Sequence, residues 1–492
     1  MAGTSIKKNT VYNAIKTISS IIFPVITFPY ISRVLLPDYL GKINFGLSIV
    51  SYFTLLATLG ITTYAIRECS AARDNKEKLS DTASQIYSIN IVTTIIAYLF
   101  LAVTLIFCGK LRNYRLLIVI QSLSIVASTL GADWINSAME DFKFITLRTI
   151  SFQFISLILM FMFVHKPEDY IKYTVISLVS SAGANIVNIW YRRRYCNIRM
   201  IWDLNNGIEW KRHMTPILYL FVMLLAHTIF NSVDSTMLGL MHGDYEVGIY
   251  STANKMFNLV SQLISSLLWV ILPRMSYYFS EGNYDKINKL LRKILAFNAL
   301  LGLPLAVGTY MLSKDIILII SGDKYIDSAE VLQILMVSLI FTLFGGDFLG
   351  NSILLPAKKE KSFMMICCIT AIVNVIMNYV FIPLYGAKAA AGTTTFCAFL
   401  MMIMLYLIVD KRIKIVRLSY VMITPLIGCL GIILICLGCT IIDNLWLRAS
   451  TSIILSVITY GIIVILGRNE LVLELILSFK QKIAGIKGAK MS

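Results

Sequence analysis

Long apolar stretches alternate with short polar segments along the whole chain. A stretch of about 20 apolar residues is long enough to cross the hydrocarbon core of a bilayer as an α-helix. Fourteen such stretches can be marked, at residues 10–32, 43–66, 83–108, 116–139, 144–164, 173–191, 213–240, 247–272, 294–312, 331–355, 362–381, 389–409, 418–441 and 449–466. No polar segment between them exceeds about 22 residues, so nearly all of the function is expected inside the membrane.

Prolines inside two of the predicted helices indicate distortions. Pro24 and Pro29 lie in the first apolar stretch, and Pro304 lies in the ninth. A proline removes a backbone hydrogen bond and clashes with the preceding turn, so each predicts a kink. Kinked helices suit a transporter, although helices that only pack against lipid also carry proline.

Composition places the chain among integral membrane proteins. Of its 492 residues 57% are hydrophobic and 14% are charged, against about 25% charged in soluble domains. The net charge of +17 comes from short basic tracts between apolar stretches, so we assign it to membrane orientation and expect no nucleic-acid partner. The nine cysteines lie mostly in apolar stretches, at spacings that predict neither a metal site nor a disulfide framework.

The basic residues are distributed unequally between alternate loops. One side, which holds both termini, carries 30 Lys and Arg, and the other carries 11. Because positive loops stay in the cytoplasm, we expect both termini there.

Two short motifs occur twice. DYLGKI at residues 38–43 reappears as DYEVGI at 244–249, and GADW at 131–134 reappears as GGDF at 345–348. The offsets of 206 and 214 residues predict a duplicated six-helix unit. Six is an even number, so the copies would be parallel repeats around a central cavity. The predicted parts are residues 1–209, residues 210–413, and residues 414–492 with two additional helices and a basic tail.

Several segments together resemble the O-antigen and capsule (Wzx-type) oligosaccharide flippases. They are residues 29–35 (PYISRVL), 67–68 with 74–79, 133–134 followed by 140–146 (EDFKFIT), 247–250 (VGIY), and 374–378 with 382–386 (IPLYG). The resemblance implies an all-α membrane fold shared with multidrug exporters of the MATE type, with two six-helix lobes that form a V. It also implies alternating access for an undecaprenyl-diphosphate-linked oligosaccharide in the bacterial cytoplasmic membrane, with a polysaccharide polymerase and other assembly proteins as partners.

Polar residues inside the predicted helices are the candidates for substrate binding. A charge at the bilayer centre is costly, so such residues normally face a cavity or a partner. The candidates for an anionic diphosphate and for sugar hydroxyls are Lys16, Arg33, Arg148, Lys255, Asn258 and Gln262. Lys16 and Lys255 could instead extend to the membrane interface, and Arg33 could pair with Asp38.

A second set of residues is a candidate for ion coupling or gating. His227, Asn231 and Asp234 share one face of the seventh predicted helix, where a histidine and a carboxylate could bind a proton or Na⁺. The histidine could equally be a packing residue that bridges two helices. The duplicated acids Asp133 and Asp347 could gate the inner mouth, or pair with a nearby basic residue; those in reach are Lys143, Arg148 and Lys358.

Other functions fit the sequence less well. No phosphate-binding loop of the G-x-x-x-x-G-K-[ST] type and no H-E-x-x-H motif occurs, so the chain is expected to be a transporter without its own ATPase and without a cofactor beyond a coupling H⁺ or Na⁺. A membrane-embedded polysaccharide polymerase would usually have a large outer loop. The nearer alternative is a MATE-like drug or organic-cation antiporter, but the candidate lining charges are mostly basic.

Overall fold

The computed structural model describes residues 6–203, 207–265, 268–413, 419–467 and 472. Over these residues the chain is helical with short connections, and no strand is assigned. It divides into two compact units, Met1–Gly248 and Ile249–Ser492. The first unit extends beyond the predicted boundary at residue 209 because α8 (Trp210–Met241) packs against α1 and α2. The three-part division at residues 209 and 413 stays a prediction.

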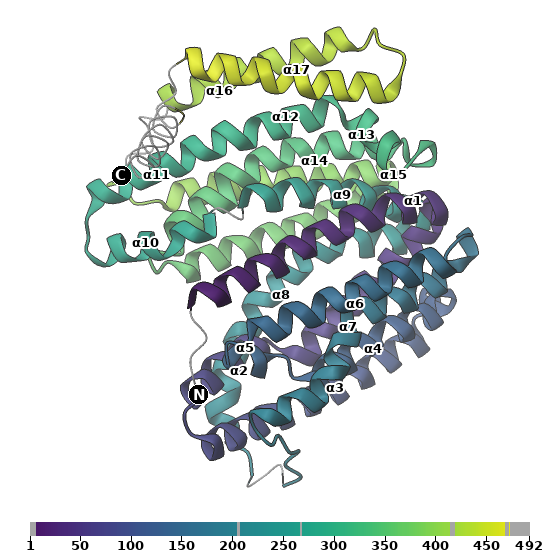
Figure 1. Cartoon of the computed structure of the whole chain (residues 1–492), viewed down its shortest axis with the longest axis vertical. Helices are drawn as coiled ribbons and strands as arrows, with labels where there is room; N and C mark the ends of the chain where they lie inside the picture. The colour runs from purple at the N-terminus through teal and green to yellow at the C-terminus, as the bar shows by residue number, and fades with distance from the viewer. Residues whose placement is uncertain (1–5, 204–206, 266–267, 414–418, 468–471, 473–492) are drawn as a thin grey trace, which may run out of the picture. The chain divides into compact units, whose positions relative to one another are not determined.

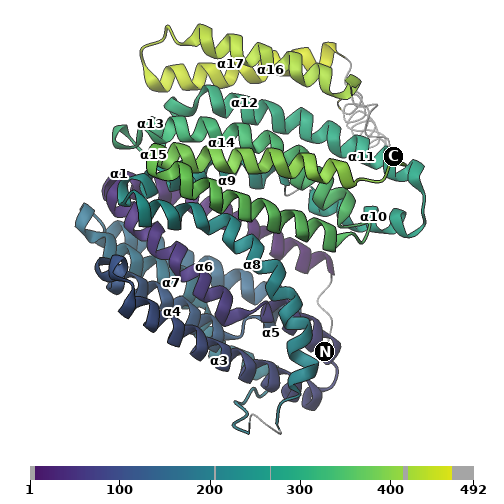
Figure 2. The same cartoon turned by 180° about the vertical axis from the view of Figure 1, so that it is seen from behind.

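The first unit consists of long helices that run side by side, together with two short ones (Figures 1 and 2). Besides α8, they are α1 (Ile6–Thr58), α2 (Ile61–Ala71), α3 (Lys76–Phe107), α4 (Arg115–Gly131), α5 (Trp134–Ala138), α6 (Phe142–Phe163) and α7 (Tyr170–Tyr191). A buried cluster of apolar side chains joins α2, α3, α5 and the start of α8. This cluster fixes the end of the unit at which α4 gives way to α5.

The second unit holds the remaining helices (Figures 1 and 2). They are α9 (Asp244–Ser265, which starts in the first unit), α10 (Leu268–Ser280), α11 (Tyr284–Phe297), α12 (Leu303–Met311), α13 (Ser313–Ile320), α14 (Ser328–Thr342), α15 (Glu360–Ile408), α16 (Ser419–Cys439) and α17 (Leu445–Leu466). Two π-helices, η4 (Asn298–Gly302) and η6 (Leu343–Leu354), interrupt the regular pattern. An apolar cluster packs η6 against α10, α11 and the end of α15.

The two longest helices are each broken by one residue outside the helical region. The break in α1 is at Leu36, with φ of 62°, and the break in α15 is at Gly386, with φ of 54°. Leu36 directly precedes Pro37, and a residue before proline is pushed out of the α-helical region. The kinks predicted at Pro24 and Pro29 are therefore not where the backbone of α1 leaves the helix. Pro304 stands at the beginning of α12, next to the π-helix η4.

The protein is a multi-pass membrane protein. Among the described residues nine helical segments are long and apolar enough to cross a membrane, or ten when a bent pair within α8 is taken as one span. Two of them, Lys8–Ala71 with 64 residues and Glu360–Ile408 with 49, each cover two of the predicted stretches. A continuous helix of 64 residues would be about 96 Å long, three times the hydrocarbon thickness. The number of fourteen spans stays a prediction.

The two copies of the DY motif contact each other through glycines in the first unit. A Cβ atom on Gly41 would lie 1.8 Å from the carbonyl oxygen of Asp244, and one on Gly248 would lie 2.1 Å from that of Pro37. Both values are far below van der Waals contact, so only glycine permits this approach. The second copy of the motif therefore limits the side chain at position 41, and the residue just before the first copy limits the side chain at position 248.

Candidate functional site

The first duplicated acid forms an ion pair inside the first unit. α4 ends at Gly131, Ala132 adopts a left-handed conformation, and Asp133 precedes α5. Arg148 of α6 places Nη2 2.6 Å from Oδ1 of Asp133. The arginine side chain is 4% exposed and the aspartate side chain 36%. Asp133 thus has its counter-charge within the protein, as one of the two sequence-based alternatives predicted.

The groups around Arg148 determine how freely it could contact a substrate. Its guanidinium lies 5.3 Å from the ring centre of Phe144, and its Nε and Nη1 have no hydrogen-bond partner in the described part of the chain. Asn136 also donates to Asp133, at 3.3 Å, and connects this acid to Asn188 of α7. Arg148 would have to leave Asp133 before it could bind a diphosphate fully, so its role in substrate binding stays a prediction.

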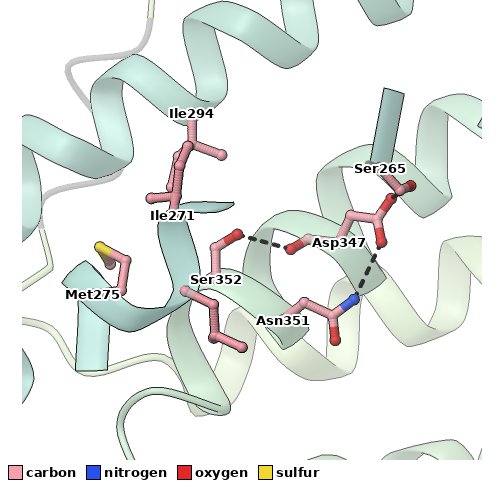
Figure 3. A pocket seen from close by; sticks show the side chains of 8 residues that line it. Ser265, Ile271, Met275, Ile294, Asp347, Asn351 and Ser352 are labelled. Atoms are coloured by element: carbon pink, nitrogen blue, oxygen red, sulfur yellow. Dashed lines mark hydrogen bonds between the residues drawn. The ribbon is translucent and has the colours of Figure 1, made fainter. Parts of the chain in front are cut away.

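The second duplicated acid has a different environment (Figure 3). Asp347 lies in the π-helix η6 and is 9% exposed. Ser265 Oγ donates to its Oδ2 at 2.7 Å, and Asn351 Nδ2 donates to its Oδ1 at 3.2 Å. Among the described residues no lysine, arginine or histidine forms an ion pair with Asp347, so the alternative of a pair with Lys358 is wrong.

A small cavity adjoins the Asp347 carboxylate. Its volume is about 10 Å³, about the space of one water, and Figure 3 shows the side chains around it. The lining residues are Ser265, Ile271, Leu272, Met275, Ile294, Asp347, Asn351 and Ser352. Apart from the acid, all the polar groups in this lining are neutral. A proton or a small cation is therefore the counter-charge that would fit here.

The candidates on α8 are placed only in part. Asp234 is 2% exposed and Asn231 is exposed, whereas the side chain of His227 lies outside the described residues. Near Asp234, the hydroxyl groups of α8 bond to those of α1. The pairs are Ser51 with Ser232 at 2.9 Å, Tyr52 with Thr236 at 3.2 Å, and Ser48 with Thr236 at 2.9 Å. The acid therefore belongs to a polar stretch of an otherwise apolar helix.

The candidates on α9 form a polar stripe on the second unit. Lys255 is half-buried, and Asn258 and Gln262, at i+3 and i+7 from it, are exposed. On α1 of the first unit, Lys16 is half-buried and Arg33 is exposed. These two residues are 17 positions apart on one helix, about 25 Å at 1.5 Å per residue, so they do not meet.

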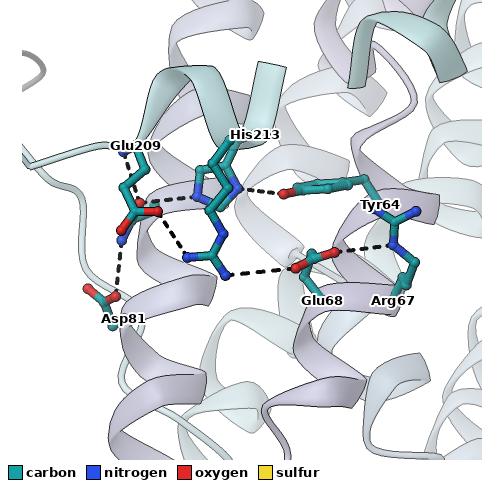
Figure 4. Close-up of polar contacts among 8 residues, drawn as sticks. Tyr64, Arg67, Glu68, Asp81, Glu209 and His213 are labelled. Atoms are coloured by element: carbon teal, nitrogen blue, oxygen red, sulfur yellow. Dashed lines mark hydrogen bonds and ion pairs between the residues drawn. The ribbon is translucent and has the colours of Figure 1, made fainter. Parts of the chain in front are cut away.

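One polar network was not anticipated from the sequence (Figure 4). His213 of α8 is fully buried, with Nδ1 2.8 Å from the Tyr64 hydroxyl of α2 and Nε2 3.1 Å from Oε1 of Gln85 of α3. Arg212 next to it pairs with Glu209 at 3.0 Å and lies 3.9 Å from Glu68. The sequence signal for this network is His213 itself, a histidine at the first position of a predicted apolar stretch. The network joins three helices at one end of the first unit.

Amide side chains link the two halves of α15. Asn378 donates to Asn374 at 3.1 Å and accepts a hydrogen bond from Thr393, and Asn374 Nδ2 lies 3.4 Å from Thr394 Oγ1. The two asparagines precede the break at Gly386 and the two threonines follow it. The two amide side chains therefore join the two halves of α15 across the break.

The chain matches known protein families and their members. Residues 6–279 match the family described as polysaccharide biosynthesis protein, and residues 220–380 match the MatE family. A capsular polysaccharide biosynthesis protein, CapF, of Staphylococcus aureus is 24% identical over 402 residues, 81% of this chain and 98% of that protein. A putative O-antigen transporter of Shigella dysenteriae is 25% identical over 387 residues, 77% of this chain and 94% of that protein.

Two solved structures share the fold. The lipid II flippase MurJ in an inward closed conformation superposes with a TM-score of 0.74 at 16% identity, covering 94% of this chain and all of that one. An inward-facing MATE multidrug transporter superposes with a TM-score of 0.58 at 13% identity, covering 86% of this chain and 96% of that one. The MATE-like fold expected from the sequence is confirmed. Because the first family match spans more than half of the sequence, the chain belongs to the polysaccharide biosynthesis protein family.

Proposed function

We propose that this protein is a flippase that moves an undecaprenyl-diphosphate-linked oligosaccharide, an O-antigen or capsule repeat unit, from the cytoplasmic to the outer leaflet by alternating access. The observation that carries the proposal is the match to a polysaccharide biosynthesis family, together with relatives covered over nearly their whole length. The protein is then a transporter, located in the bacterial cytoplasmic membrane with both termini in the cytoplasm. A polysaccharide polymerase and other assembly proteins would receive its product.

The chemistry of such a substrate explains the residues proposed to bind it. Moving an oligosaccharide head group through about 30 Å of hydrocarbon unaided would strip water from many hydroxyls and two phosphates. A protein must replace that water with donors and acceptors. The polar stripe of Lys255, Asn258 and Gln262 on α9 offers an ammonium for phosphate and two amides for sugar hydroxyls. Lys16, Arg33 and Arg148 would supply further cationic groups.

Coupling to a proton or Na⁺ gradient is a second part of the proposal. A buried carboxylate without a fixed cationic partner is a group whose charge a mobile cation can neutralise. Asp347 has this character among the described residues, since its hydrogen-bond donors are the neutral side chains of Ser265 and Asn351. The sequence also makes Asp234 on α8 a candidate for this role, and its side chain is buried.

The experiment is a leaflet-transfer assay with the purified full chain in liposomes. We expect the protein to move undecaprenyl-diphosphate oligosaccharide between leaflets, faster with an inward proton or Na⁺ gradient. In cells, Lys255→Ala should abolish surface polysaccharide at normal protein level, and the matched variant Lys255→Arg should retain part of it because the charge survives. Full activity of Lys255→Ala would remove this residue from the binding site.

The MatE match supports a second candidate, a drug or organic-cation antiporter on the same fold. Such a protein would extrude cationic dyes from the same liposomes under the same gradient. Dye efflux without movement of lipid-linked sugar, in a preparation shown to be folded, would favour the antiporter and overturn the flippase proposal.

A further inference from the structure

A second, larger cavity lies at one end of the second unit and shares no lining residue with the cavity at Asp347. Its volume is about 350 Å³, within the range of small-molecule sites. α10 and α11 meet at this end of the unit (Figure 1), and the segment after η6 and the end of α15 complete the wall. The cavity is large enough for a polar head group.

The charged side chains of this cavity are mostly basic. Lys358, Lys359 and Arg412 line it, with Asp410 as the single acid. Asp410 accepts hydrogen bonds of 2.8 to 3.2 Å from the guanidinium of Arg412, which lowers the pKa of the Asp410 carboxyl to about 2. Asp410 and Arg412 are therefore both ionised at neutral pH, and their opposite charges cancel. The two lysines leave the cavity with an excess of positive charge.

The lysines are positioned to bind an anion. Lys358 is exposed, and in the described part of the chain its side chain has no hydrogen bond or ion pair. Its φ of 57° is uncommon for a residue other than glycine and turns the chain sharply after η6. The Lys359 ammonium has a weak contact of 3.4 Å with the carbonyl of Ile408. Ser276 and Ser280 of α10 add hydroxyl groups to the same lining.

The cavity lies where membrane-spanning segments end. Three candidate spans, Tyr284–Met311, Ser328–Leu354 and Glu360–Ile408, begin or end at its wall. The ends of spans lie at the level of lipid head groups, and basic pockets between helices at this level suit anionic lipids. Phe279, Leu354 and Ile413 provide apolar surface next to the basic groups. A ligand with both an anionic and an apolar part fits this lining better than a free ion does.

We propose that this cavity binds the phosphate head group of an anionic phospholipid, with the ammonium groups of Lys358 and Lys359 on the phosphate oxygens. Ammonium–phosphate hydrogen bonds are charge-assisted and need no further counter-ion. Arg412 stays bound to Asp410 and stacks on Tyr284, 4.5 Å from its ring centre, so it shapes the wall. The site lies outside the proposed transport residues and does not depend on the proposed function.

The test compares lipid retention by the full chain, purified in a zwitterionic detergent. Native mass spectrometry would measure binding of phosphatidylglycerol and of phosphatidylcholine. We expect the wild type to prefer phosphatidylglycerol and the double variant Lys358→Asn/Lys359→Gln to bind it about 30-fold more weakly, from roughly 1 kcal/mol for each lysine at a membrane surface. Asn is chosen at position 358 because it tolerates the left-handed backbone.

The matched control is Lys361→Gln, which removes an exposed lysine two positions away that does not line the cavity. It should bind phosphatidylglycerol like the wild type. The assignment of this cavity as a lipid site would be overturned if Lys361→Gln bound phosphatidylglycerol as weakly as the double variant does. It would also be overturned if the double variant bound phosphatidylglycerol as tightly as the wild type. Should the double variant fail to fold, Lys358→Asn alone must still weaken binding several-fold.

Two further arms distinguish the source of the phosphate. Inorganic phosphate at millimolar concentration should leave phosphatidylglycerol bound; equal binding of inorganic phosphate alone would overturn the assignment to a lipid. Displacement of phosphatidylglycerol by undecaprenyl-diphosphate oligosaccharide, but not by other anionic lipids, would overturn it in favour of a substrate site. The lipid-binding measurement involves no transport, so a negative result there does not bear on the flippase proposal. A negative result in the leaflet-transfer assay likewise does not bear on the lipid site.

Discussion

At the scale of single residues, the two acids of one duplicated motif differ in whether a basic side chain pairs with them. Asp133 has a fixed guanidinium from Arg148, whereas Asp347 has only neutral donors among the described residues. The offset of 214 residues that relates the acids places Ser362 at the position equivalent to Arg148. The second copy thus lacks a basic residue at the equivalent position, in agreement with the neutral donors that surround Asp347 in the described part of the chain.

The Asp133–Arg148 pair should contribute to stability. Asp133→Asn leaves a buried guanidinium without its counter-charge, which costs about 3 to 5 kcal/mol in fully buried pairs. We expect a loss of about 1 to 3 kcal/mol, because Asp133 is 36% exposed and water compensates in part. Unfolding in mixed micelles with increasing SDS measures it. The control Glu140→Gln removes the exposed partner of Arg73 and should cost less than about 1 kcal/mol; equal effects would contradict the assignment.

Asp347→Asn tests the proposed coupling. The amide keeps the size of the side chain and can still bond to Ser265 and Asn351, but it carries no charge for a proton or Na⁺ to neutralise. We expect the rate of lipid-linked sugar movement without a gradient to be retained and its stimulation by the gradient to be lost. The exposed acid Asp323 gives a matched control, Asp323→Asn, which should respond to the gradient like the wild type. Persisting stimulation in Asp347→Asn would exclude this acid from coupling.

At the scale of elements, the sequence predicts where helices lie better than where they break. In the part of the chain that the structure describes, each of the fourteen apolar stretches overlaps helical residues, because hydrophobic length is a strong signal for a helix in a membrane. The prolines gave a weaker signal: Pro24 and Pro29 lie inside α1, while the break occurs before Pro37, in the polar segment between two stretches. The π-helix at Asp347 has no signal in a single sequence, since it depends on how η6 packs against α10 and α11.

The break at Gly386 gives a prediction for α15. Its φ of 54° and ψ of −132° suit only glycine, so Gly386→Ala should strain the turn that joins the two halves by about 1 to 3 kcal/mol. Gly392 in the same helix is the matched control, since a Cβ there would meet nothing within 4 Å. Gly392→Ala should be neutral or stabilise by up to about 1 kcal/mol through helix propensity. Thermal unfolding in detergent should place Gly386→Ala below the wild type and Gly392→Ala at or above it; the reverse order would contradict the assignment of the break.

At the scale of the whole molecule, composition and motif order were sufficient to predict a membrane transporter of this family. Contacts between distant residues were not predictable in the same way. The network of Tyr64, Gln85 and His213 brings together side chains more than 100 positions apart, and their partners become apparent only in the fold. For Asp133 the sequence already offered Arg148 as a partner, because the two residues are only 15 positions apart. Other basic residues are also near in the sequence, so the choice among them became apparent only in the fold.

Orientation in the membrane is a prediction for the complete chain. With 30 basic residues on one side against 11 on the other, both termini should be cytoplasmic. Reporter fusions after Gly207 and Asn283 should be active only as cytoplasmic reporters, and fusions at Gly243 and Gly322 only as exported ones. A reversed pattern would refute the topology.

The glycine contact between the two DY motifs has a consequence for how the duplicated sequence can vary. Gly41 lies against the backbone of the second motif and Gly248 against the residue that precedes the first. The offset of 206 residues aligns Gly41 with Val247 and Gly248 with Lys42, so the two glycines stand at different positions of the repeat. A larger side chain at either position would therefore meet backbone atoms in the same region, so position 41 and position 248 are each restricted to glycine although neither is a copy of the other.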